Sequence, residues 1–96
     1  MDIKQLRYFI AIAEEGSLSA AAQRVNVAQP SLSQHVLSLE REQDVKLLER
    51  SSRGVSLSES GEVLLSVARD IRNALHYGAY AVGLAGGEAI GDVGVG

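Results

Sequence analysis

The longest helical pattern in the chain begins at Ser58 and continues without a proline to about Ala85. At 1.5 Å per residue, such a helix is roughly 40 Å long. Its apolar positions alternate spacings of four and three, which is the heptad pattern of a helix that packs against another helix. These positions are Leu64, Ala68, Ile71, Leu75, Gly78 and Val82. Because the rest of a 96-residue chain cannot cover so long a helix, we expect this seam to pair two copies of the chain.

Three shorter helical patterns precede the long one. Apolar residues recur at helical spacing over residues 3–13, and Gly16 ends this first pattern. Ser17 is placed as the N-cap of a second helix over residues 18–25. A third helix begins at Gln29-Pro30, since the first helical position tolerates proline. We expect its buried stripe to consist of Leu32, Val36 and Leu39.

Two short apolar runs, residues 45–50 and 55–58, are joined by a polar segment that ends in Gly54 and predict a small β-hairpin. Three helices followed by a two-stranded wing are the order of a winged helix-turn-helix. The predicted fold is therefore mainly α, with a winged helix-turn-helix over residues 1–57 and a dimerising linker helix over residues 58–85. Glycines at the end of that helix are expected to interrupt it, so that residues 86–96 form a hinge and the start of a further domain; they are Gly83, Gly86 and Gly87.

Composition narrows the functional classes. The chain has no cysteine, which removes disulfides and thiolate zinc sites, and its two histidines, His35 and His76, would need carboxylate ligands to hold a metal. No stretch approaches the ~20 apolar residues that cross a bilayer, and the first residues lack a signal-peptide pattern. We therefore expect a soluble, cytoplasmic protein without a membrane partner.

The net charge of −3 has the wrong sign for binding to phosphates. However, residues 1–57 carry seven basic and seven acidic side chains, so the whole excess of negative charge lies in residues 58–96. What matters for binding is the field at one face of the protein. The charge alone therefore neither predicts nor excludes a nucleic-acid partner.

The start of the third helix carries hydrogen-bonding side chains of modest size. Glutamine, as at Gln29 and Gln34, can pair with N6 and N7 of adenine, and a serine hydroxyl, as at Ser31 and Ser33, suits a phosphate or a base edge. The positive end of the helix dipole lies at the same place. Arg53, at the tip of the hairpin, is placed to enter a minor groove or to contact a phosphate. This arrangement predicts recognition of double-stranded DNA.

Six short motifs occur in the order and at the spacing of a known family. They are Leu6-Arg7-Tyr8-Phe9, residues 16–22, residues 28–34 (Ala-Gln-Pro-Ser-Leu-Ser-Gln), Leu39-Glu40, Leu48-Glu49-Arg50 and Arg53-Gly54-Val55. Together they resemble the N-terminal domain of bacterial LysR-type transcriptional regulators, and the resemblance covers residues 1 to about 85.

The resemblance implies a site on DNA. The contacts it implies come from the recognition helix, from the wing and from two positions at phosphates: Gln29, Pro30, Ser31, Ser33, Gln34, Arg53, Lys4 and Ser17. Relatives often have arginine at the position of Gln34 and a basic or polar residue at that of Leu37, so the base preference stays open.

The resemblance also implies a mode of action. A family member is a sequence-specific regulator of transcription that binds an interrupted inverted repeat as a homodimer through the linker helix and usually forms a tetramer at full length. RNA polymerase is a further candidate partner. A small-molecule co-inducer binds the family's C-terminal domain, so no cofactor is expected for residues 1–96.

Other interpretations remain beside this one. A helical protein-interaction module without DNA affinity fits the net charge. An enzyme does not fit, because no strained nucleophile turn or base beside a hydroxyl is visible. Among single residues, Ser17 is either a cap or a phosphate contact, Arg50 either pairs with Glu49 and its acidic neighbours or holds a phosphate, and His35 either packs or contacts a phosphate.

Overall fold

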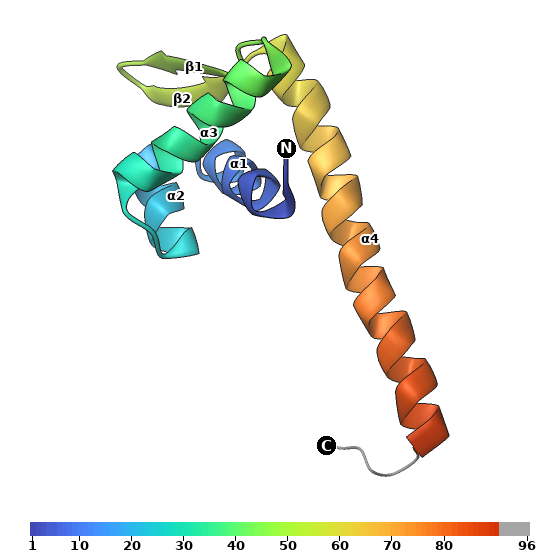
Figure 1. The fold of residues 1–96 in the computed structure, drawn as a ribbon. Coiled ribbons are helices and arrows are strands. Elements are labelled where there is room, and N and C mark those ends of the chain that lie inside the picture. The colour runs from blue at the N-terminus through green and yellow to red at the C-terminus, as the bar shows by residue number, and fades with distance from the viewer. Residues whose placement is uncertain (91–96) are drawn as a thin grey trace.

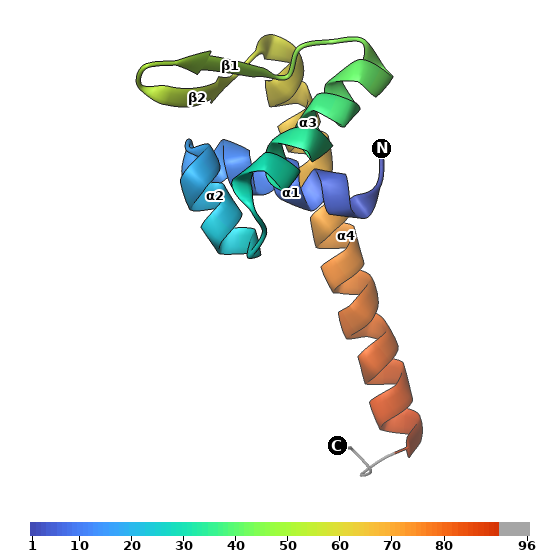
Figure 2. The ribbon, with the colours of Figure 1, turned by 60° about the vertical axis from the view of Figure 1, so that its left-hand side comes forward.

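The computed structural model describes residues 1–90, with the side chains of residues 1–86, as four helices and one hairpin (Figure 1). The helices are α1 (Ile3–Glu15), α2 (Leu18–Val25), α3 (Gln29–Gln43) and α4 (Glu59–Ile90), and the strands are β1 (Leu48–Ser51) and β2 (Gly54–Leu57). The first three helices gather into one unit with the hairpin beside them, while α4 extends away from it as a rod (Figures 1 and 2). The predicted order and the mainly helical class are confirmed.

The first two helices begin at side chains that cap them. Asp2 accepts a hydrogen bond from the backbone N–H of Gln5 at 2.8 Å, and the Gln5 side chain accepts one from the backbone N–H of Asp2, which forms a capping box. Ser17 Oγ accepts a hydrogen bond from the backbone N–H of Ala20 at 3.2 Å. Gly16 ends α1 in the left-handed conformation. The predicted N-cap and the predicted end of the first helix are thus confirmed.

Helix α3 begins one residue before its proline. The sequence predicts Pro30 as the first residue of the helix, and this is wrong by one position. Gln29 already has helical geometry and Ala28 is the N-cap, so Pro30 is the second residue. The second position tolerates proline for the same reason as the first, since none of the first N–H groups has a partner within the helix. The first bond of the helix runs from Leu32 N–H to the carbonyl of Ala28 at 3.1 Å.

The core lies between α1, α3 and the beginning of α4. The predicted stripe of α3 is confirmed, since Leu32, Val36 and Leu39 are at most 2% exposed. Further buried side chains come from α1, α2, the strand β1 and α4, among them Phe9, Ile12, Ala21, Leu48 and Leu65. Burial of each large aliphatic side chain stabilises the fold by about 1.5–3 kcal/mol. This core holds α3 in place with its polar surface outward.

The wing is a β-hairpin with a two-residue turn, and it is fixed to the turn between α1 and α2. Ser51 pairs with Gly54, so that Ser52 and Arg53 form the tip. Val55 N–H donates to the carbonyl of Gly16 at 3.2 Å. Gly54 has a φ of +122°, and a Cβ atom there would lie 2.7 Å from the Gly16 oxygen. Only glycine meets both conditions, and the wing therefore keeps a fixed position beside the start of α2.

Helix α4 continues through Gly83 and Gly86 to Ile90, and the prediction that these glycines interrupt it is wrong. Each glycine costs a helix about 1 kcal/mol relative to alanine, and neighbouring residues such as Leu84 and Ala85 favour helix strongly enough to offset this. With 32 residues the helix is about 48 Å long. The predicted hinge and further domain fall partly on this helix, and residues 91–96 lie outside the described part. Within residues 1–90, no helix has both the length and the apolar character to cross a membrane.

The heptad seam of α4 divides into two parts. Ala68 is 1% exposed and Leu64 and Ile71 pack against the core of the same chain. Ala68 is thus a core residue, and its assignment to a dimer seam is wrong in this structure, because α1 lies along the first half of α4 and covers it. Beyond that contact, Leu75 is 50% and Val82 is 72% exposed. The second part of the seam is therefore the more exposed one.

Candidate nucleic-acid interface

Most of the predicted residues of α3 lie on its surface. Gln29, Pro30, Ser31 and Gln34 are exposed and Ser33 is half-buried. The backbone N–H groups at this end of the helix point away from it and give it a partial positive charge. The structure therefore presents a short polar helix start with unpaired donors, which is what contact with base edges and phosphates requires.

One side of α3 lines an open groove of about 550 Å³ between this helix and the start of α1. Ser31, Gln34, Ser38 and Arg41 follow one another along the groove at spacings of three and four, so they share one face of the helix. Sequence reasoning had selected the first two and missed Ser38 and Arg41. The helical spacing from Gln34 was the available signal for both.

A second groove, of about 260 Å³, lies between the start of α2, the start of α3 and the wing. It brings the predicted residues Ser17 and Gln29 together with Ser19, Arg50 and Ser51. Ser17 and Ser19 share a hydrogen bond of 3.1 Å between their hydroxyls. Three chain segments thus contribute hydrogen-bonding groups to one concave surface beside the recognition helix.

Arg50 is the strongest addition to the predicted site. It is exposed, it lines the second groove, and none of the ion pairs in residues 1–86 involves it. Within residues 1–86 Arg50 thus forms no ion pair with Glu49, and its contact with a phosphate stays a prediction. Arg53 is exposed at the tip of the wing, where its backbone N–H donates to Ser51 Oγ at 3.2 Å.

Two other residues are placed differently. Lys4 is exposed near the start of α1 and lines neither groove, so the structure does not bring it together with the other predicted contacts. His35 packs edge-on against Tyr8, with ring centroids 4.9 Å apart and an interplanar angle of 75°. His35 also lines the larger groove, so its position is compatible with both of its interpretations, packing and a phosphate contact. In the described part of the chain, no three His, Cys, Asp or Glu side chains are grouped as metal ligands.

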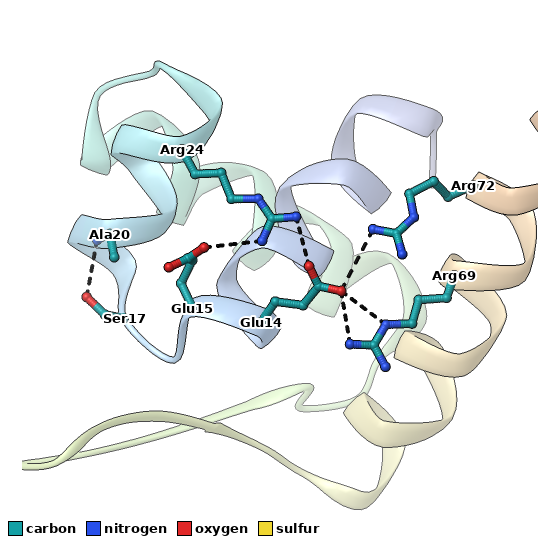
Figure 3. Close-up of polar contacts among 7 residues, drawn as sticks. All are labelled: Glu14, Glu15, Ser17, Ala20, Arg24, Arg69 and Arg72. Atoms are coloured by element: carbon teal, nitrogen blue, oxygen red, sulfur yellow. Dashed lines mark hydrogen bonds and ion pairs between the residues drawn. The ribbon is translucent and has the colours of Figure 1, made fainter. Parts of the chain in front are cut away.

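Several acidic side chains of the first 57 residues have partners within the protein. Glu40 accepts hydrogen bonds from the backbone N–H groups of Leu47 and Leu48 at 2.8 and 3.1 Å. Glu42 pairs with the terminal amine. Glu14 binds arginines of two other helices (Figure 3). These three carboxylates line neither groove, and Asp2 is the acidic residue that lines the groove beside α3.

The Glu14 network has a consequence for stability against acid. The hydrogen bond from Arg24 holds the pKa of Glu14 below its ordinary value of 4.5. Burial opposes this effect in part, and the hydrogen bond from Arg69 lowers the pKa further. A lowered pKa in the folded state stabilises the fold above the unfolded pKa, and this contribution disappears as the pH falls through the folded value.

We expect Glu14→Gln to be less stable than the unmodified chain at pH 7, by about 0.2–1 kcal/mol for each ion pair lost. Below pH 4.5 the two proteins should approach each other in stability, because the unmodified carboxylate becomes protonated there. Urea unfolding at pH 7 and at a series of acidic pH values measures the difference. A difference that stays constant over the whole series would contradict the role of this carboxylate.

Comparison with known proteins assigns the fold to a family. The model of the bacterial regulatory helix-turn-helix proteins of the lysR family matches residues 3–62. The HTH-type transcriptional regulator TfdT of Cupriavidus pinatubonensis (strain JMP 134 / LMG 1197) is 46% identical over 71 residues, which are 74% of this chain and 31% of that protein. The nitrogen assimilation regulatory protein nac of Klebsiella aerogenes is 41% identical over 96 residues, the whole of this chain and 32% of that protein.

A solved structure gives the same result at the level of the fold. The DNA-binding domain of CbnR, crystallised in complex with DNA, superposes with a TM-score of 0.83 at 40% identity over 90% of this chain and 99% of that one. The chain thus spans about a third of the length of the curated relatives and nearly the whole of an isolated DNA-binding domain. With its helix-turn-helix, its wing and its long fourth helix, the chain belongs to the LysR family of bacterial regulatory helix-turn-helix proteins.

Proposed function

We propose that this chain is the DNA-binding part of a transcriptional regulator that reads an interrupted inverted repeat in double-stranded DNA. The proposal rests on one observation: the polar start of α3 lines a groove to which Ser17, Gln29 and Arg50 all contribute. Gln29, Ser33 and Gln34 would read base edges, while Arg50 and Arg53 would hold phosphates. A relative with 40% identity has been crystallised on DNA, which supports the proposal.

The proposal includes a homodimer formed through α4. Two recognition helices read successive major grooves when they lie about 34 Å apart, one turn of DNA, and such spacing needs a rigid connection between the copies. The second half of α4 extends beyond its own domain and leaves the apolar side chains of Leu75 and Val82 exposed on one side. Gly78 lies between them and has open space around it, so a partner helix can approach closely there.

We expect Leu75→Glu to shift the dimer to monomer, because each copy would bring a charge into an apolar contact. The matched control is Asn73→Glu, since this exposed position lies on the opposite side of the helix at 100° per residue. Analytical ultracentrifugation over a range of concentrations measures the dissociation constant of each variant. If Asn73→Glu dissociates the dimer and Leu75→Glu does not, the seam through Leu75 is not the interface.

Selection from a pool of random duplexes at physiological salt tests DNA reading itself. We expect the unmodified chain to enrich an interrupted inverted repeat over several rounds. A folded dimer that enriches no sequence would contradict the proposal and favour a protein-interaction module built on α4.

The remaining parts of the proposal concern the longer protein. The curated relatives are about three times as long as this chain, and a small-molecule co-inducer is expected to act on the part outside it. A tetramer of the full-length protein and a contact with RNA polymerase follow from the family in the same way. A role on bacterial DNA would place the protein in the cytoplasm.

A further inference from the structure

We propose that Glu14 is a positioning residue that sets the direction of α4 relative to α3 and, in a dimer, the spacing between half-sites that the protein accepts. The inference rests on the proposed function, because spacing has meaning only for a dimer that reads two half-sites. It concerns a residue that lies in neither groove of the DNA interface.

The beginning of α4 is fixed to the winged domain at one point. Ser58 N–H donates to the carbonyl of Leu47 at 2.9 Å, and the Ser58 hydroxyl donates to the carbonyl of Lys46. Gly61 lies so close to this segment that a Cβ atom would overlap with the Leu47 oxygen. This contact holds the first turn of α4, and the burial of Leu65 and Ala68 against the core holds the two turns that follow.

A second polar attachment of α4 is a carboxylate. Glu14, near the end of α1, accepts hydrogen bonds from Arg69 Nε at 3.2 Å and from its Nη2 at 2.9 Å, and Arg72 Nη1 lies 3.8 Å from the same oxygen. Its other oxygen accepts a bond from Arg24 of α2 at 2.8 Å. Figure 3 shows the three arginines reaching Glu14 from two sides. One carboxylate therefore connects α1, α2 and α4.

The apolar packing between α1 and α4 leaves open space at this junction. A cavity of about 150 Å³ lies between α1 and α4, lined by Leu6, Ile10, Ile71 and Leu75 among others. A second cavity, of about 220 Å³, lies on the other side of Arg72 and is lined also by Arg7, Ile10 and Arg24. Close packing resists small displacements, and open space beside a contact removes part of that resistance. The ion pairs of Glu14 therefore influence the direction of α4 more than they would if the junction between α1 and α4 were fully packed.

The length of α4 amplifies small changes at the junction. From Gly61 to Ile90 the helix extends about 44 Å, so a rotation of about 5° at its base moves its far end by about 4 Å. One base pair step is about 3.4 Å along the DNA axis. A change in the angle between α4 and its domain can thus be too small to disturb the core of either protomer and still change the preferred half-site spacing by one base pair.

The test uses duplexes that carry the selected half-sites separated by gaps that differ by single base pairs. We expect the unmodified dimer to prefer one gap and Glu14→Gln to broaden or shift that preference by about threefold to tenfold in relative affinity. Glu62→Gln is the matched control, since this exposed carboxylate on α4 takes part in none of the ion pairs of residues 1–86.

The outcomes separate this inference from the proposed function. An unmodified chain that binds no inverted repeat contradicts the proposed function. If the unmodified chain prefers one gap and Glu14→Gln keeps the same profile, the inference is wrong. An equal loss at every gap would also contradict it, because such a loss shows a general effect on folding or affinity.

A second measurement needs no DNA. The chain has no cysteine, so Gln23→Cys and Tyr80→Cys introduce two unique spin-label sites, one on α2 and one on the exposed part of α4 away from the seam. With labelled chains diluted into unlabelled ones, we expect Glu14→Gln to broaden or shift the distance distribution within a chain. An unchanged distribution in a folded variant would contradict the inference.

Discussion

Gly61→Ala is expected to lower the free energy of unfolding by about 1–3 kcal/mol, the usual effect of forcing atoms into a filled space. The added Cβ would overlap with the carbonyl oxygen of Leu47 and lie 3.2 Å from the Cβ of Leu57. Both neighbours belong to the hairpin or the segment before it, and Gly61 N–H is itself bound to Ser58 Oγ at 3.0 Å. The substitution must therefore move α4 away from the wing.

Gly83→Ala is the matched control for this prediction. It is the same substitution on the same helix, at a position with no atom within 4 Å of the added Cβ. Because alanine is the better helix former, we expect it to raise stability by up to about 1 kcal/mol. Urea unfolding of all proteins at one protein concentration measures both effects, since dimerisation makes stability depend on concentration. Two changes of the same sign would contradict the close approach at Gly61.

The parts of the fold that depend on neighbouring residues could be predicted from the sequence. The stripe of Leu32, Val36 and Leu39 requires only helical periodicity, and the cap at Ser17 only a hydroxyl before a helical run. The hairpin follows from two short apolar runs and a glycine. Each of these signals lies within a few residues of the structure that it specifies.

The path of α4 across its own domain could not be predicted in the same way. A heptad pattern shows that a helix has an apolar stripe and does not show what covers it. Ala68 is covered by its own domain and Leu75 is not, although both occupy the same stripe. Glu14 and Arg69 are 55 residues apart, so no local pattern connects them. Gly61 and Gly83 look alike in the sequence and differ only in their surroundings in the fold.

The part of the candidate site that lies on one helix could be predicted from the sequence. The prediction is incomplete for the part where several chain segments meet. The residues at the start of α3 were selected from their chemistry and their position after Ala28. The sequence leaves two interpretations of Arg50, because only the folded hairpin brings it to the same groove as Ser17. Lys4 is predicted from the family resemblance alone, and in the fold it lines neither groove.

Gln34→Ala and Arg53→Ala are expected to affect DNA binding in different ways. Gln34 is exposed on the face of α3 that lines the larger groove, and its amide can form two hydrogen bonds with one base. Its loss should weaken binding to the selected repeat by about 1–3 kcal/mol for each half-site and leave binding to a scrambled duplex almost unchanged. Arg53, at the tip of the wing, carries a charge whose loss should weaken binding to both duplexes.

The dependence on salt distinguishes a base contact from a phosphate contact. Each phosphate contact contributes about 0.9 to the slope of log K against log salt concentration, because binding releases condensed counterions. Arg53→Ala should therefore reduce this slope by about 1 for each protomer, whereas Gln34→Ala should leave it unchanged. Fluorescence anisotropy at several salt concentrations measures both quantities, with Gln43→Ala, an exposed glutamine at the far end of α3, as the control. An equal loss on selected and scrambled DNA from Gln34→Ala would show that this side chain does not read a base, and the face of α3 through Gln29 and Ser33 would then have to carry the specificity.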